Sequence, residues 1–243
     1  MALSAPLFPR ALAAALLALA LAAGGEAAVS SALPARPAPG RPLTAASLKE
    51  WARVLQDPAR DIESRRLAVA VLRAEGSKAA AATPELAAAL GDPDVRLRRT
   101  SALALARIAS DHARVAPALH RALADPDWRV RQTAAVGLMR LGPKAPRRVL
   151  ARLMERISDK HWPVRQAAIH AVSRIGPRAS DVPRIAGALR DPLWTVRVSA
   201  AVALRRLGRD AASSEKALVE ALGDETPKVR KAAQAALDAV RAK

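Results

Sequence analysis

The chain of 243 residues has no cysteine, no tyrosine, one phenylalanine and four histidines. The lack of cysteine excludes disulfide bonds, thiol nucleophiles and cysteine-ligated zinc. The histidines show no i, i+4 pairing with a carboxylate, and the sequence has neither a glycine-rich phosphate loop nor a serine nucleophile elbow. These absences predict a protein without catalysis, metal or cofactor, whose core is built from alanine and leucine.

Acidic residues are also scarce, because 22 aspartates and glutamates stand against 40 lysines and arginines, for a formal net charge of +18. Such a balance predicts an anionic partner. An acidic protein or peptide, a nucleic acid, and an anionic envelope polymer or lipid all satisfy it. A compositional bias toward arginine and alanine is the alternative, in which the charge serves no ligand.

One phrase recurs along the chain. DPDWRVRQTAAVGLMRLG, which starts at Asp125, returns as DKHWPVRQAAIHAVSRIG from Asp159 and as DPLWTVRVSAAVALRRLG from Asp191, with weaker copies from Asp57, Asp92 and Asp224. An arginine in each copy recurs at steps of 32 to 34 residues. A fixed period in this range is typical of a solenoid, in which each unit buries its apolar face only against its neighbours.

Each unit reads as two helices. The apolar residues of the phrase follow helical spacing at Val130, Ala134, Leu138 and Leu141. Asp125 is expected to cap this helix and Gly142 to end it. A shorter helical stretch lies between successive phrases, and no segment alternates with period two for long enough to form a strand. The sequence therefore predicts an all-α fold of about six stacked antiparallel helix pairs.

The pattern D-P-x-W-x-V-R-x-x-A-A-x-A-L-x-x-L-G resembles the HEAT repeat of the type shared with phycobilisome lyases and with consensus-designed HEAT arrays. The resemblance covers residues 43–243 and implies a right-handed, HEAT/armadillo-like α-solenoid whose second helices line the concave face. It names a fold and not a reaction. A bilin-lyase-like subunit is an alternative that rests on this family analogy alone.

The first 42 residues have a different composition. In residues 1–28, Arg10 precedes an apolar run from Ala11 to Ala23 and a cluster of small residues, which is typical of a secretory signal peptide. An unstructured alanine-rich tail and an uncleaved N-terminal anchor are the alternatives. Residues 29–42 are rich in proline and are expected to form an extended linker before the repeat array of residues 43–243. The sequence therefore predicts an exported protein, periplasmic or extracellular.

Two charged positions recur in the units and are interpreted as architecture. The repeat aspartates are Asp92, Asp125, Asp159, Asp191 and Asp224, and the arginines six residues later are Arg98, Arg131, Arg165, Arg197 and Arg230. The family resemblance implies that such residues pair between neighbouring units, and partly buried charges need partners of this kind. We therefore expect a structural ladder of charge along the array.

The side of the second helices opposite the core carries a basic stripe. Helical projection places there Arg96, Arg99 and Arg129 near the helix starts, Val136 and Ile169 in the middle, and Arg107, Arg140, Arg174 and Arg206 near the helix ends. A solvated charged face is the plain alternative. The mixture of arginine and aliphatic residues favours a concave groove that binds an acidic protein segment. Nucleic-acid binding through the same arginines is the second hypothesis, although few aromatic rings are present on which bases stack.

Tryptophan recurs at the start of three second helices, as Trp128, Trp162 and Trp194. The position favours a stacked ladder that fills the gap between neighbouring units, and contact with a partner is the alternative. Trp51 lies in the first helix and is expected in the core of the N-terminal unit. Taken together, the pattern predicts a non-catalytic scaffold.

Overall fold

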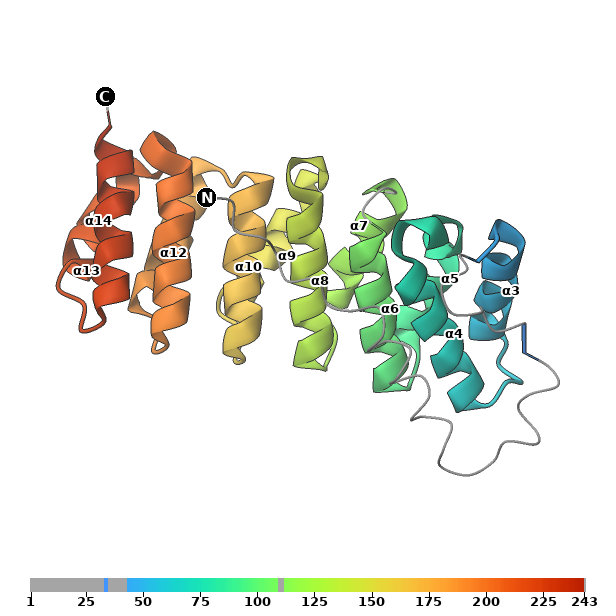
Figure 1. The fold of residues 1–243 in the computed structure, drawn as a ribbon. Helices are drawn as coiled ribbons and strands as arrows, with labels where there is room; N and C mark the ends of the chain where they lie inside the picture. Colours follow the sequence, from blue (N-terminus) through green and yellow to red (C-terminus); the bar gives the residue numbers. More distant parts are fainter. Residues whose placement is uncertain (1–32, 35–42, 109–111, 243) are drawn as a thin grey trace, which may run out of the picture.

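A computed structural model describes residues 33–34, 43–108 and 112–242. It shows six antiparallel helix pairs in one row, and the described residues form no strand, so the predicted all-α solenoid is confirmed (Figure 1). The first helices of the pairs are α3 (Ala45–Gln56), α5 (Thr83–Ala88), α7 (His112–Ala122), α9 (Leu150–Arg156), α11 (Val182–Gly187) and α13 (Glu215–Ala221). The second helices are α4 (Ile62–Glu75), α6 (Val95–Arg107), α8 (Trp128–Leu141), α10 (Trp162–Ile175), α12 (Trp194–Leu207) and α14 (Pro227–Arg241).

Short 3-10 helices tighten the connections: η2 (Gly76–Ala82), η3 (Ala89–Gly91), η4 (Gly142–Lys144), η5 (Arg147–Val149), η6 (Ala179–Asp181), η7 (Ala188–Arg190) and η8 (Gly208–Ser214). They shorten the α-helical part of the first helices, whereas every second helix has 13 to 15 residues. The second helices stand side by side as one regular layer in Figure 1. We call the outward surfaces of the two layers the first-helix face and the second-helix face.

The second helices begin later than the repeat phrase indicates. Asp127 is the N-cap of α8, and its side chain accepts hydrogen bonds from two backbone amides of the first turn. The prediction that Asp125 caps this helix is wrong, because Asp125 accepts a bond from the Asp127 amide in the preceding turn. The predicted end is confirmed: Gly142 follows α8 with φ of 53°, a left-handed conformation that favours glycine.

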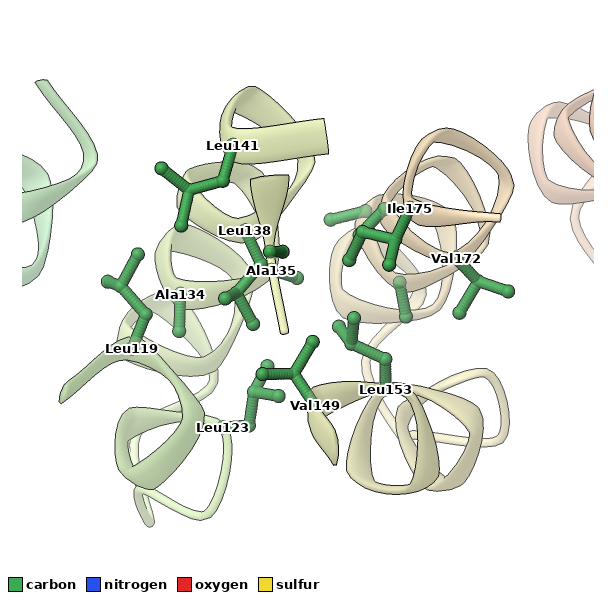
Figure 2. Packing of buried hydrophobic residues seen from close by; sticks show 14 of the residues in the cluster. Leu119, Leu123, Ala134, Ala135, Leu138, Leu141, Val149, Leu153, Val172 and Ile175 are labelled. Carbon is green, nitrogen blue, oxygen red and sulfur yellow. The ribbon is translucent and has the colours of Figure 1, made fainter. Parts of the chain in front are cut away.

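The hydrophobic core lies between the two layers. Figure 2 shows side chains from both layers directed toward one another, among them Leu119 of α7, Leu123 in the turn after α7, Val149 of η5 and Leu153 of α9. All four are fully buried, as are Ala134 and Ala135 of α8. Small side chains let neighbouring helices approach closely, so alanine and leucine fill most of this core.

The N-terminal predictions, a signal peptide at 1–28 and a linker at 29–42, lie outside the described residues except at positions 33 and 34. Leu33 is half-buried and packs against the core. Over the described ranges, no helix combines the length and the apolar character needed to cross a membrane. The array begins at α3, where Trp51 is 1% exposed and lies in the core, as predicted.

Candidate functional site

The repeat arginines contact the aspartates of the following unit. In four junctions the arginine Nε lies 2.6 to 2.8 Å from the aspartate Oδ2, in the pairs Arg98–Asp125, Arg131–Asp159, Arg165–Asp191 and Arg197–Asp224. Nη2 donates to the other carboxylate oxygen. Nε also donates in the first three pairs, which are therefore bidentate, whereas in Arg197–Asp224 only Nη2 forms a hydrogen bond. Arg65 forms an ion pair with Asp92 at the first junction. These contacts connect one helix pair to the next.

The same guanidinium groups also hold the turn of their own unit. Nη1 of Arg131 donates to the carbonyl oxygens of Asp125 and Pro126, at 2.8 and 3.0 Å. Equivalent bonds form at Arg98, Arg165, Arg197 and Arg230. The side chains of Arg131 and Asp159 are only 6% and 3% exposed. Every guanidinium nitrogen of Arg131 therefore has a protein acceptor, and this geometry suits architecture rather than ligand binding.

Arg230 differs because it lies in the last helix pair. It donates to the carbonyl oxygens of Asp224 and Glu225 at 2.8 and 3.1 Å, and it is exposed. Within the described part of the chain it forms no ion pair with a carboxylate. This position is therefore a natural comparison for the buried arginines of the same register.

A second row of ion pairs runs beside the first in the N-terminal half. Nη2 lies 2.5 Å from the carboxylate in the pair Arg66–Asp94 and 2.6 Å in the pair Arg99–Asp127. Arg99 is therefore not a free cation of the basic stripe, contrary to the sequence prediction. The sequence signal for this row is a second aspartate two residues after the repeat aspartate. Only two copies of the repeat phrase have it, as Asp94 after Asp92 and Asp127 after Asp125.

These contacts lower the pKa values of the aspartates. The side-chain hydrogen bonds from Arg99 outweigh desolvation and lower the pKa of Asp127 to about 2, and those from Arg66 lower the pKa of Asp94. The folded-state pKa is thus below the unfolded value of about 4. The stabilisation from such a carboxylate is complete above about pH 4 and is lost as the pH falls through the folded value.

Replacing Asp127 with asparagine is expected to lower the free energy of unfolding at neutral pH by about 1 kcal/mol, because asparagine still caps α8 but cannot pair with Arg99. The native chain loses this advantage between about pH 4 and pH 2. The melting temperatures of the two proteins, followed by circular dichroism, should therefore converge at the acid end. A gap that persists at about pH 2 would show that the ion pair is not its source.

The second-helix face carries an open hollow where three units meet. Its volume is about 380 Å³, and it is lined by Arg73 of α4, by Leu103, Ala106 and Arg107 of α6, and by Gln132, Thr133, Val136 and Arg140 of α8. Leu103 is 40% exposed and forms the apolar part together with the half-buried Val136. The lining residues include three cations and no carboxylate.

The three arginines of the hollow form no ion pair with any carboxylate in the described ranges. Arg140 donates Nη1 to the carbonyl oxygen of Ala106 at 3.3 Å. Nε of Arg73 is buried and has no acceptor. Burial and the charge of Arg107 lower the pKa of Arg73. The hollow is therefore a place of uncompensated positive charge, which a bound carboxylate would relieve.

The other arginines of the basic stripe lie along the same layer. Arg174 of α10 and Arg206 of α12 are exposed near the ends of their helices, in register with Arg107 and Arg140. Arg96 and Arg129 are exposed at the starts of α6 and α8, on the opposite end of the layer from the hollow arginines. The structure thus brings Arg107, Val136 and Arg140 together at the hollow. The other exposed arginines of the stripe, Arg96, Arg129, Arg174 and Arg206, lie elsewhere along the layer.

Ile169 does not belong to the exposed stripe. It is fully buried, because it lies ten residues after the repeat aspartate Asp159, in the register of the buried Ala135. The register of Val136 is occupied in α10 by His170, which is half-buried and whose pKa is lowered by burial. A shift of one residue rotates a helical position by about 100°, which is enough to move a side chain from the surface to the core.

The tryptophans lie at the edge of the array and not in a stack of indoles. Trp128 stacks on His161 of the next unit, with ring centroids 5.4 Å apart, and the Arg129 guanidinium lies 4.5 Å from the Trp128 ring centroid. Trp162 and Trp194 are 47% and 37% exposed. In the described part of the chain no two tryptophans contact each other as rings. The predicted tryptophan ladder is therefore wrong, and the edge remains accessible.

Two residues of the second-helix face were not predicted from the sequence. His170 lies eleven residues after Asp159, in the register of Val136, so a count from the repeat aspartate is the signal that could have found it. Arg73 lies in the irregular first repeat, where it follows Arg65 by eight residues while Arg107 follows Arg98 by nine. The described residues contain no cluster of histidine, aspartate and glutamate that could hold a metal ion. The face therefore offers arginines, aliphatic side chains and amide or hydroxyl groups.

Comparison with known proteins supports this architecture. The family model for HEAT repeats matches residues 48–139 and 116–205, and the sequence matches no curated protein. A designed armadillo repeat protein in complex with the peptide (KR)4 aligns with a TM-score of 0.64 at 18% identity, over 79% of this chain and 99% of that chain. The complex of CpcE and CpcF of phycocyanin lyase from Nostoc sp. PCC7120 aligns with a TM-score of 0.57 at 25% identity, over 84% and 80%.

Proposed function

Because the chain belongs to the HEAT-repeat family of stacked helical units, we propose that it is a non-catalytic scaffold that binds an acidic, extended protein segment on its second-helix face. The observation that carries the proposal is the hollow, where Arg73, Arg107 and Arg140 lack carboxylate partners beside exposed Leu103. Carboxylates of a ligand supply the missing acceptors, and an aliphatic ligand residue covers the apolar part.

The sign of the ligand charge follows from the arginines of the face. A designed protein of the same fold was solved with the basic peptide (KR)4. In the present chain Arg107, Arg140, Arg174 and Arg206 recur in register along successive second helices. We therefore infer the charge-reversed ligand, an acidic segment that runs along the row. The arginines also steer such a ligand toward the face before contact.

The proposed place of action is outside the cytoplasm. The support is the signal-like composition of residues 1–28, with its apolar run and small residues. The lyase activity of the phycocyanin lyase relative is not part of the proposal, because that similarity concerns the fold. An exported scaffold needs only a partner-binding surface, which the second-helix face supplies.

Binding of a fluorescent (DE)4 peptide, followed by anisotropy, tests the function. Replacing Arg73, Arg107 and Arg140 together with glutamine is expected to weaken binding by roughly 10- to 100-fold, because each partly exposed pair contributes about 0.5–1 kcal/mol. The matched control replaces Arg121, Arg148 and Arg152 of the first-helix face, which removes the same charge. The control should bind (DE)4 nearly as well as the native chain.

Three outcomes would overturn the proposal. Failure of the native chain to bind (DE)4 would do so, and so would equal losses in the two triple variants, since only net charge would then matter. The third is binding of single-stranded DNA that is tighter than binding of (DE)4 and that does not change when Leu103 and Val136 are replaced by serine. Phosphate contacts ignore those aliphatic side chains, so that pattern would assign the face to nucleic acid.

A further inference from the structure

The first-helix face carries a second group of cations, at the junction of α7 and α9. The group consists of Arg121 in α7, Arg148 in η5 and Arg152 in α9, which we call the first-helix arginines. Figure 2 shows Leu123, in the turn that follows α7, beside Val149 in the buried interface that joins these helices. Arg121 and Arg148 are exposed and Arg152 is half-buried, so the arginines lie on the outer side of this interface.

His120, a half-buried side chain of α7, lies within range of the charges of all three first-helix arginines. Burial lowers the pKa of His120, and the charges of Arg152, Arg148 and Arg121 lower it further, while Glu155 acts in the opposite direction. Glu155 is itself paired with Arg156 at 3.4 Å. Over the described ranges, the first-helix arginines form no ion pair with a carboxylate. Positive charge is therefore left uncompensated here as well.

This surface differs from the hollow in its chemistry. The exposed large apolar side chains of the described residues all lie outside α7, η5 and α9. The connection before α9 adds two more exposed cations, Lys144 and Arg147. A charged surface without an apolar floor fits a broad and deformable anionic partner better than a single peptide, whose side chains need an apolar contact to fix the register.

We propose that the first-helix arginines form a second anion-binding site, which attaches the array to a lipid bilayer with anionic headgroups. Basic side chains near such a surface are attracted by its negative potential, and the attraction grows with each added cation. The hollow lies on the other layer of helices and shares no residue with this site. The chain can therefore hold an acidic segment while it rests on a membrane, and the membrane site does not depend on what the hollow binds.

Cosedimentation with vesicles tests this inference. The full chain is mixed with phosphatidylcholine vesicles that contain about one third phosphatidylglycerol, and with vesicles of phosphatidylcholine alone. Replacing the three first-helix arginines with glutamine is expected to weaken binding to the anionic vesicles roughly 100-fold. The matched control is the triple glutamine variant of Arg73, Arg107 and Arg140, which should stay within about threefold of the native chain.

All three proteins share the same N-terminal residues, so a difference between them isolates the arginines. Circular dichroism verifies that each variant keeps its helical content, and a misfolded triple variant is replaced by the single Arg148→Gln variant, whose side chain is exposed. Equal losses in the two triple variants, or equal binding to both kinds of vesicle, would overturn the proposal. Binding of duplex DNA that requires the first-helix arginines, in a chain that ignores anionic vesicles, would also overturn it and assign the site to nucleic acid.

Discussion

Replacing Arg131 with methionine is expected to lower the free energy of unfolding by about 3–5 kcal/mol, because Asp159 is left charged and buried without its partner. The Asp159 side chain is 3% exposed, and it receives both Nε and Nη2 of Arg131 at 2.8 Å. Arg156 lies 3.6 Å away, too far to replace the bidentate contact. The same substitution also removes two donors from the turn carbonyls of Asp125 and Pro126.

The matched substitution is Arg230→Met in the last pair. Arg230 is exposed and donates only to backbone carbonyls, so its loss is expected to cost less than about 1 kcal/mol. Urea unfolding followed by circular dichroism gives both free energies. Losses of similar size at the two positions would contradict the interpretation that these arginines act by joining one unit to the next.

Replacing Trp51 with alanine is expected to lower the free energy of unfolding by about 3–5 kcal/mol, because the indole is fully enclosed in the core of the first pair and its removal leaves a cavity. Trp51 is 1% exposed. The Trp162→Ala change, at an indole that is 47% exposed, is expected to cost less than about 1 kcal/mol.

Thermal and urea unfolding of the two tryptophan variants measures this difference. The Trp51→Phe variant is expected to lose less unfolding free energy than Trp51→Ala, because phenylalanine keeps most of the buried volume and removes an indole N–H that has no acceptor. If Trp162→Ala destabilised the chain as much as Trp51→Ala, the edge tryptophans would be part of the core. A small loss of stability in Trp162→Ala would show that folding does not need this indole, which can then contact a partner.

The repeat made the fold predictable from the sequence. The number of units follows from the period of 32 to 34 residues, and the helical type follows from the spacing of Val130, Ala134 and Leu138. Stacking of the units follows because each unit can bury its apolar side chains only against its neighbours. The ends of the helices were less predictable. Asp125 and Asp127 are both suitable caps in the sequence, and only the path of the turn decides which of them meets the first amides of α8.

The candidate site was predictable in outline and not in detail. Arg107, Arg140 and Val136 follow from the helical projection. Ile169 was assigned to the register of Val136, but it lies ten residues after Asp159, which is the core register of Ala135. The pairing of Arg99 with Asp127 joins residues 28 positions apart, so it depends on how adjacent units are packed. The first-helix arginines come from two successive units and become one group only when α7 and α9 lie side by side.

The most direct test of the central proposal is a map of backbone amide chemical shifts during titration with the (DE)4 peptide. Binding on the second-helix face predicts that the amides of α4, α6 and α8 around Arg73, Arg107 and Arg140 shift in a saturable way, and that the histidine signals of His170 shift more than those of His120. Shifts confined to α7 and α9, or the same shifts produced by (KR)4, would contradict the assignment of an acidic segment to this face.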